Sequence, residues 1–256
     1  MSAPLGRLWL VPNTLDLGTD SETALDQVLP RAVIARAAGL SHWVAENAKT
    51  TRAFLKRVDQ VCPLALPLQA IDIVELPRPR KGVGTASAGA PDLQPLLAPA
   101  MSGHDIGLLS EAGLPAVADP GAGLVQSAHA LGIAVEPLSG PSSLLLALAA
   151  SGLNGQSFAF VGYLPVEATA RAARIRELEA LSRRFGQTQI AIETPYRNGA
   201  LLAALAEHLQ PQTRLAVACG LTLPGGWCRT LPARQWREQT ATLPDRMPAV
   251  FSFLAG

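Results

Sequence analysis

LLSEAGLPAVADPGAGLVQSAHALGIAVEPLSGPSS, the segment Leu108–Ser143, is the stretch that decides the fold of this chain. Apolar runs predict a strand over Ile106–Leu109 and a second strand over Ala134–Leu138. Between them, apolar residues at helical spacing predict a helix over Gly121–Leu131. Strands that alternate with helices are typical of an α/β sheet.

Both strands end in loops of small residues. The first strand is followed by Ser110, Glu111, Ala112 and Gly113, and the second by the segment Gly140–Ser143. A tight turn that needs glycine would explain one such loop, but here the arrangement is repeated after the second strand. In an open parallel sheet, ligands bind in the crevice beyond the carboxyl ends of the strands. We therefore expect a ligand site where these two adjacent strands end, and a helix N-cap at Ser142 or Ser143 is compatible with it.

The composition predicts a compact globular protein. Apolar residues make up 48% of the 256 residues, charged residues 16%, and the formal net charge is +1, so no global attraction to polyanions is expected. The longest apolar runs are shorter than the roughly 20 residues of a membrane span, and Met1–Arg7 does not resemble a secretory signal. Cys62, Cys219 and Cys228 are scattered, as reduced thiols are. We expect a soluble, cytoplasmic protein with no membrane contact.

Strand and helix patterns continue on both sides of Leu153–Gln156, a segment that has the composition of a linker. We therefore predict two α/β domains, residues 1–153 and 154–256. In the first, short strands are expected at Val33–Ala35 and His42–Ala45. The segment Pro77–Pro91 has no periodicity and is expected to be a loop.

Several common kinds of site are disfavoured. No dinucleotide-binding glycine fingerprint follows the first strand, Leu8–Val11, and no phosphate-loop motif occurs, which argues against ordinary NAD and ATP enzymes. The four histidines are isolated from one another and from the cysteines, so no metal site and no histidine-based triad is expected. Arg78, Arg80 and Lys81 could hold phosphates, although a solvated loop explains them equally well.

The motifs resemble those of the tetrapyrrole methylase superfamily, and are most similar to its ribosomal RNA small-subunit methyltransferase I branch. The resemblance is nearly continuous from Asp105 to Pro165 and patchier elsewhere. It is carried by Ser110–Pro115, Ala118–Gly121, Pro137–Ser143, Ala150–Leu153 and Phe158–Pro165, and by Glu46–Leu55, Ile192–Arg197 and Pro248–Leu254.

This resemblance implies a class III methyltransferase fold, with two α/β domains, a cofactor cleft between them and S-adenosylmethionine as the cofactor. It also implies a homodimer, and RNA, ribosomal RNA in that branch, as the methyl acceptor. Backbone-rich loops would contact the cofactor. By position these are Leu10, Val11, Pro12 and Asn13; Ser110, Glu111, Ala112, Gly113 and Pro115; Gly140, Pro141, Ser142 and Ser143; Ile192 and Glu193; and Pro248 and Ala249.

A carboxylate is needed to accept the proton of an attacking hydroxyl. Glu111 is the first candidate for this catalytic base, followed by Glu46, Asp119 and Glu193. The candidate substrate-binding residues are Arg78, Arg80, Lys81 and Arg197. A carbon atom of a tetrapyrrole, a small-molecule acceptor, is the alternative to RNA, and a cofactor-binding paralogue without catalysis is a third hypothesis.

The chain departs from the pattern of that branch at several positions. Its first loop reads Val11-Pro12-Asn13-Thr14-Leu15 and lacks the usual glycine. Asn47 replaces an aspartate, Tyr196 replaces a histidine, and the segment 77–81 stands near the place of a His-Asn-Glu segment. Cofactor binding survives such changes more easily than substrate identity does, so we interpret the chain as a paralogue within the superfamily and not as the ribosomal enzyme itself.

Overall fold

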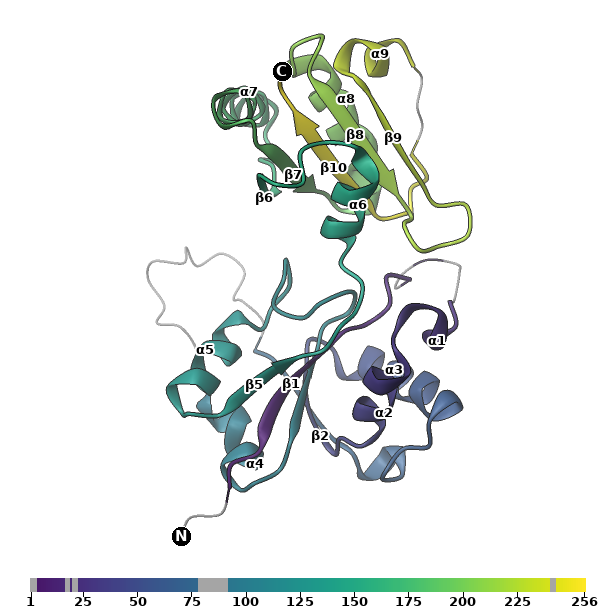
Figure 1. Ribbon diagram of the computed structural model, residues 1–256, viewed down its shortest axis with the longest axis vertical. Helices are drawn as coiled ribbons and strands as arrows, with labels where there is room; N and C mark the ends of the chain where they lie inside the picture. Colours follow the sequence, from purple (N-terminus) through teal and green to yellow (C-terminus); the bar gives the residue numbers. More distant parts are fainter. Residues whose placement is uncertain (1–3, 17–18, 20–22, 78–91, 240–242) are drawn as a thin grey trace. The chain divides into compact units, whose positions relative to one another are not determined.

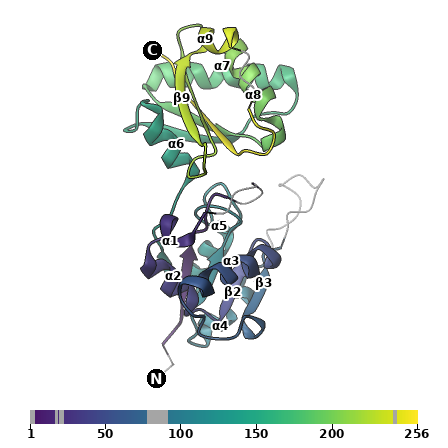
Figure 2. The same ribbon diagram turned by 90° about the vertical axis from the view of Figure 1, so that its right-hand side faces the viewer.

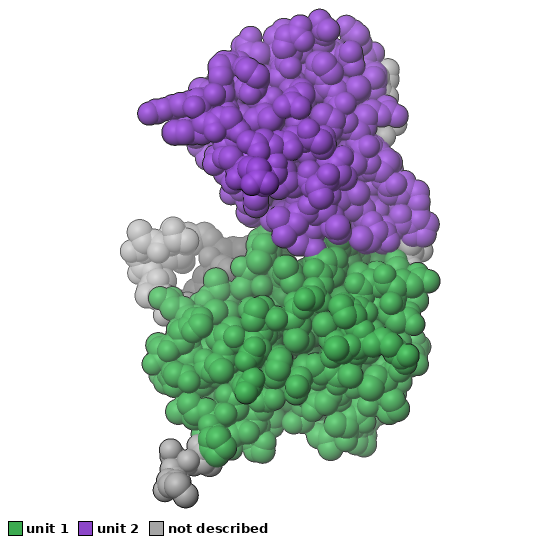
Figure 3. Space-filling model, viewed as in Figure 1, with its two compact units in different colours: residues 1–17, 23–141 green, residues 18–22, 142–256 purple. Residues whose placement is uncertain are grey.

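The computed structural model describes residues 4–16, 19, 23–77, 92–239 and 243–256. The chain divides into two compact units, shown in different colours in Figure 3. Unit 1 comprises Met1–Leu17 and Thr23–Pro141, and unit 2 comprises Gly18–Glu22 and Ser142–Gly256. Each unit has its own sheet, which confirms the prediction of two α/β domains.

Unit 1 is built on a five-stranded sheet in the order β3-β2-β4-β1-β5, and all of its neighbouring strands are parallel. The strands are β1 (Arg7–Val11), β2 (His42–Ala45), β3 (Asp72–Glu75), β4 (Ile106–Leu109) and β5 (Ala134–Pro137). The α-helices are α1 (Leu25–Val28), α2 (Arg31–Ala38), α3 (Ala48–Val61), α4 (Ala98–Met101) and α5 (Ala122–Ala130), with 3-10 turns η1 (Leu68–Ala70) and η2 (Gln94–Leu97).

Helices cover both faces of this sheet (Figure 1). On one face, α1, α2 and α3 bury a cluster that includes Ile34, Leu55 and Trp43. On the other face, η2, α4 and α5 bury a cluster around Leu97 and Leu124. The sheet is therefore the middle of three layers, and its inner strands β1, β2 and β4 place apolar residues on both faces, as parallel strands usually do.

The order of the strands corrects one expectation. The strands that end at Leu109 and Pro137 are not neighbours, because β1 lies between β4 and β5 and pairs with both. The connection from β1 to β2 and the connection from β4 to β5 run toward opposite edges of the sheet. The helices of these two connections lie on opposite faces of the sheet. The crevice beyond the carboxyl ends of β1 and β4 is thus a topological switch point, the usual ligand site of such sheets.

The expected strand at Val33–Ala35 is wrong, because these residues lie within α2. The helix begins after Pro30, and it buries Val33, Ile34, Ala37 and Ala38, which are spaced as one helical face. Two β-branched residues in succession resemble a strand locally, and the helical repeat is visible only over the whole segment.

Unit 2 is built on a mixed five-stranded sheet in the order β6-β7-β10-β8-β9 (Figure 1). Figure 2 shows β9, at one edge of this sheet, in the view turned by 90°. Strand β6 is parallel to β7, and the other neighbouring pairs are antiparallel. The strands are β6 (Phe158–Tyr163), β7 (Thr188–Ile192), β8 (Arg214–Cys219), β9 (Trp227–Pro232) and β10 (Ala249–Leu254). The helices are α6 (Ser143–Ser151), α7 (Ala168–Phe185), α8 (Asn198–His208) and α9 (Ala233–Glu238), with the 3-10 turn η3 (Pro195–Arg197).

Helix α6 explains where the chain divides. Its residues Leu144 and Leu148 pack on one face of the unit 2 sheet, against β8, β9 and β10, while α7, α8 and α9 cover the other face. The chain therefore divides at Pro141–Ser142, one helix before the boundary expected at residue 153. Within the described part of the chain, no helix combines the length and apolarity that crossing a membrane requires.

Candidate functional site

The loops after β1 and β4 are fastened together at the switch point of unit 1. The backbone N–H of Asn13 donates to the carbonyl of Gly113 at 2.9 Å, and its side-chain amide donates to the carbonyls of Ser110 and Glu111 at 3.2 and 3.0 Å. Asn13 is buried, so these hydrogen bonds are shielded from competing water. One side chain therefore sets the path of the loop that carries Glu111.

The third loop, after β5, lies against the first. A Cβ atom on Gly140 would lie 2.2 Å from the Cβ of Pro12, so only glycine allows the two loops to come this close. The structure thus brings together the three predicted cofactor loops of unit 1, which end β1, β4 and β5. They form one continuous rim at the carboxyl edge of the sheet.

The segment after β4 has an unusual backbone. Gly113 has a φ of 68°, and Ala116 and Ala118, with φ of 65° and 63°, also lie in the left-handed region. Alanine in this region costs of the order of 1 kcal/mol per residue. Such strain persists only where surrounding contacts fix the loop, and it is found most often at ligand sites.

The three predicted catalytic carboxylates of unit 1 influence one another. Glu46 follows β2, and its carboxylate accepts a hydrogen bond from the backbone N–H of Glu111 at 3.2 Å. Burial, followed by the negative charges of Glu46 and Glu111, raises the pKa of Asp119 to about 7. The cluster therefore holds a proton near neutral pH and favours a ligand that carries positive charge.

We expect Asp119→Asn to raise the melting temperature at about pH 8, and to do so progressively less as the pH falls toward about 4. The pKa of Asp119 is raised from 3.8 to about 7 on folding. The contribution of this carboxyl to stability is therefore complete below its unfolded pKa and is lost as the pH rises through 7. Asparagine has no charge to lose. Thermal denaturation across this pH range measures the difference.

Asp26→Asn is the matched control, because Asp26 is an exposed carboxylate in the first turn of α1. Its effect on the melting temperature should not follow the same pH dependence. The proposed proton on Asp119 would be contradicted if the melting temperatures of Asp119→Asn and the unchanged protein differed by the same amount at every pH.

The predicted cofactor residues of unit 2 also lie together, at the end of β7. Ile192 pairs with Val250 in β10, which places Glu193 beside Pro248 and Ala249. The carboxylate of Glu193 is buried and forms an ion pair with Arg197 at 2.9 Å. Arg197 is therefore neutralised within the protein, so as a predicted substrate-binding residue it would have to share its guanidinium between Glu193 and the substrate.

A family model described as Tetrapyrrole (Corrin/Porphyrin) Methylases matches residues 49–226 of the chain, which is more than half of its length. The chain belongs to this family.

Two curated relatives in sequence share one name. A ribosomal RNA small subunit methyltransferase I from Mesorhizobium japonicum is 40% identical over 127 residues, which is 50% of this chain and 42% of that protein. The protein of the same name from Pseudomonas aeruginosa is 35% identical over 140 residues, 55% of this chain and 48% of that protein. The matched segments therefore span less than half the length of these relatives.

Solved structures of tetrapyrrole methylases share the fold. A uroporphyrin-III-C-methyltransferase from Thermus thermophilus aligns over 97% of this chain and 94% of that chain, with a TM-score of 0.52 and 19% identity. The methyltransferase CobJ aligns over 99% of this chain and 100% of that chain, with a TM-score of 0.56 and 14% identity. At these identities the likeness concerns the fold alone.

One part of the site was missed from the sequence. Arg57, on α3, donates to both carboxylate oxygens of Asp16, at 2.9 and 3.3 Å, and to the hydroxyl of Thr14 at 3.1 Å. Burial opposes the ionisation of Asp16. The hydrogen bonds that it accepts from Arg57, the Thr14 hydroxyl and the backbone of Thr23, together with the charge of Arg57, nevertheless hold its pKa below the ordinary value. Thr14 in turn donates its backbone N–H to Asn13. Helix α3 therefore supports the loop that carries Asn13.

The remaining site residues have varied surroundings. Ser110 is 3% exposed, and its buried hydroxyl has no hydrogen-bond partner among the described residues. Ser142 occupies the N-cap position of α6, but its side chain makes no cap hydrogen bond. Asn47 caps α3 by accepting from the N–H groups of Lys49 and Thr50, which is the structural task an aspartate would perform there. Arg78, Arg80 and Lys81 lie outside the described residues.

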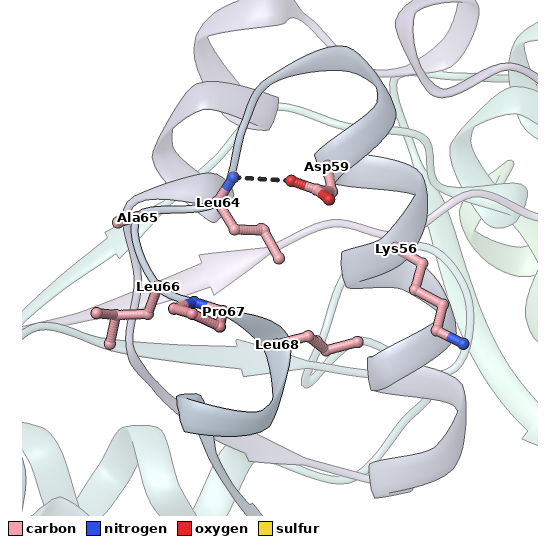
Figure 4. A pocket seen from close by; sticks show the side chains of 7 residues that line it. All are labelled: Lys56, Asp59, Leu64, Ala65, Leu66, Pro67 and Leu68. Carbon is pink, nitrogen blue, oxygen red and sulfur yellow. Dashed lines mark hydrogen bonds between the residues drawn. The ribbon is translucent and has the colours of Figure 1, made fainter.

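Three pockets in the described part of the chain lie away from the predicted site residues. Figure 4 shows a cavity of about 270 Å³ between α3 and the segment Leu64–Leu68. Two others, of about 350 and 330 Å³, lie beside His42 and beside Trp236. None of the three is lined by a predicted site residue. Among the residues that the structure describes, no group of three or more His, Cys, Asp or Glu side chains could hold a metal ion.

Proposed function

We propose that the protein is an S-adenosylmethionine-dependent methyltransferase that acts on RNA, with a ribose hydroxyl as the acceptor. The observation that carries this proposal is the gathering of the loops after β1, β4 and β5 and of three carboxylates at the switch point of unit 1. The names of the relatives that are 35% and 40% identical support RNA as the substrate. We also propose that it works in the cytoplasm as a homodimer, as the resemblance implies.

The residues of the site suit this cofactor. S-adenosylmethionine has a positive sulfonium and a positive ammonium group, and a cation would relieve the mutual repulsion of Glu46, Glu111 and Asp119. The buried hydroxyl of Ser110 supplies a hydrogen-bond donor that the described protein groups leave unused. The lack of a side chain at Gly140 lets the loop after β5 lie directly against Pro12. We propose that Ile192, Glu193, Pro248 and Ala249 contribute from unit 2.

When bound, the cofactor supplies a methyl carbon that is already electrophilic. The protein therefore has to align the acceptor oxygen in line with that carbon and take up the proton of the hydroxyl. Glu111 is the proposed base, with its backbone N–H fixed by Glu46 and its carbonyl fixed by Asn13. Such anchoring limits the movement of the carboxylate, which is what a positioned base requires.

A tetrapyrrole carbon is the second candidate acceptor, because the solved structures with this fold include a uroporphyrin methyltransferase. Two measurements separate the candidates. Tritium passes from methyl-labelled cofactor to RNA only if RNA is the acceptor, whereas a porphyrinoid that binds changes its absorbance on titration with the protein. Labelling of RNA without such a change supports our proposal, and the reverse result would replace it.

A further inference from the structure

The two tyrosines of this chain lie at the same edge of unit 2, and both are exposed. Tyr163 ends β6, pairs with Ile192 of β7 and is 59% exposed. Tyr196 lies in η3, just beyond the end of β7, and is 75% exposed. Because β6 and β7 are parallel, both rings stand at the carboxyl edge where Glu193 also lies.

Arginines flank this edge. Arg171, in the first turns of α7, donates to the carbonyl of Val166 in the loop that follows Tyr163. Arg197 is the residue after Tyr196 and is 26% exposed in its side chain. Guanidinium groups beside exposed aromatic rings match the chemistry of a nucleic-acid strand, because the guanidinium groups attract phosphates and the bases stack on the rings.

The charge of the chain is divided unevenly and favours the same partner. Residues 142–256 contain eleven arginines, no lysine and seven acidic residues, a formal charge of +4. Residues 1–141 contain ten basic and thirteen acidic residues, a formal charge of −3. An arginine-rich half beside an acidic half points to polyanion binding by the arginine-rich half.

We propose that Tyr163 and Tyr196 form a base-stacking rim that receives an unpaired RNA strand at the β6–β7 edge of unit 2. This inference rests on the proposed function and adds to it the form of the substrate. Bases inside a duplex are already stacked on one another, so only an unpaired strand can offer its faces to these rings. Arg171 then contacts a phosphate on one side, and Arg197 contacts a phosphate on the other while it shares its guanidinium with Glu193. The bases stack without sequence preference.

The test is the fluorescence anisotropy of a labelled oligouridylate of roughly 10 nucleotides, titrated with the full chain and its variants. Tyr163→Ala and Tyr196→Ala should each weaken binding by about 5- to 150-fold, the range measured for the loss of one stacked base. Tyr163→Phe and Tyr196→Phe should bind as the unchanged protein does, because phenylalanine keeps the ring. The dependence of binding on salt should keep its slope, because the phosphate contacts remain.

Phe185→Ala is the matched control. Phe185 is also an exposed aromatic residue of unit 2, with the Arg184 guanidinium 5.0 Å from its ring centre, but it lies at the opposite end of α7 from Arg171. Its loss should leave binding of the oligonucleotide unchanged. Three results would each overturn the rim. Phe185→Ala could weaken binding as much as the tyrosine variants do, duplex RNA could bind as tightly as the single strand, or neither tyrosine variant could change binding.

The outcome is separable from that of the proposed function. If the unchanged protein methylates RNA while the tyrosine variants bind and methylate it equally well, the rim alone is wrong. If the unchanged protein transfers no methyl group to RNA, the proposed function fails whatever the anisotropy shows. Loss of S-adenosylmethionine binding in the tyrosine variants, measured by calorimetry, would assign these rings to the cofactor and would also overturn the rim.

Discussion

Glu111→Gln should reduce methyl transfer by about 100- to 10,000-fold while S-adenosylmethionine still binds, because general-base catalysis contributes this much to such steps. Glutamine keeps the size of the side chain but cannot accept the proton of the acceptor hydroxyl. The backbone N–H of Glu111, which donates to Glu46, and its carbonyl, which accepts from Asn13, are unaffected by the change. The loop should therefore keep its conformation. Single-turnover transfer to RNA and calorimetry of cofactor binding measure the two effects separately.

Glu177→Gln is the control for this variant. Glu177 is an exposed glutamate on α7 that pairs with Arg174, and it belongs to no predicted site. Its substitution should leave transfer unchanged. Normal turnover by Glu111→Gln with cofactor bound would remove Glu111 as the base and direct attention to Glu46 or Asp119.

Arg57→Met should lower the free energy of unfolding by roughly 3 kcal/mol, the low end of the cost of breaking a buried ion pair. Arg57 and Asp16 are 17% and 8% exposed in their side chains, so methionine leaves a largely buried carboxylate without its cation. Native hydrogen bonds and the charge of Arg57 hold the pKa of Asp16 below its ordinary value. The stabilisation is therefore complete above that ordinary value and is lost as the pH falls through the folded value. Urea denaturation near neutral pH and in acid measures both effects.

Arg7→Met is the comparison for Arg57→Met. Arg7 forms an equally short pair with Glu136, at 2.8 Å, but the two side chains are 53% and 39% exposed. A solvated pair of this kind contributes about 0–1 kcal/mol. If the two substitutions lowered the free energy of unfolding equally, burial would not distinguish the two ion pairs. That result would contradict the role of α3 in supporting the loop after β1.

Several regular elements of the fold could be predicted closely from the sequence. The strands at His42–Ala45 and Ile106–Leu109 have the bounds that their apolar runs predict. The order of the strands could not be predicted, because the apolar runs of β4 and β5 contain nothing that specifies β1 as the strand between them. Sequence periodicity reports which face of an element is buried, whereas strand neighbours depend on packing between distant segments.

The same limit applies to the site. The loops at Ser110 and Gly140 could be found because small residues after strands are visible in the sequence, whereas the loop at Pro12 was implied by the family resemblance. The contact of Arg57 with Asp16 could not, since 41 positions separate them and neither belongs to a motif. The left-handed backbone of Ala116 and Ala118 was also hidden, because alanine gives no signal for that conformation.

The measurement that tests the central proposal most directly is the transfer of tritium from methyl-labelled S-adenosylmethionine to small ribosomal subunits and to free ribosomal RNA, with Glu111→Gln assayed in parallel. We expect label in RNA with the unchanged protein, located on a ribose after nuclease digestion, and label reduced at least about 100-fold with the variant. Two results would contradict the assignment of this chain as an RNA methyltransferase. One is that the cofactor binds neither the unchanged protein nor Glu111→Gln, and the other is that no RNA is labelled at any protein concentration.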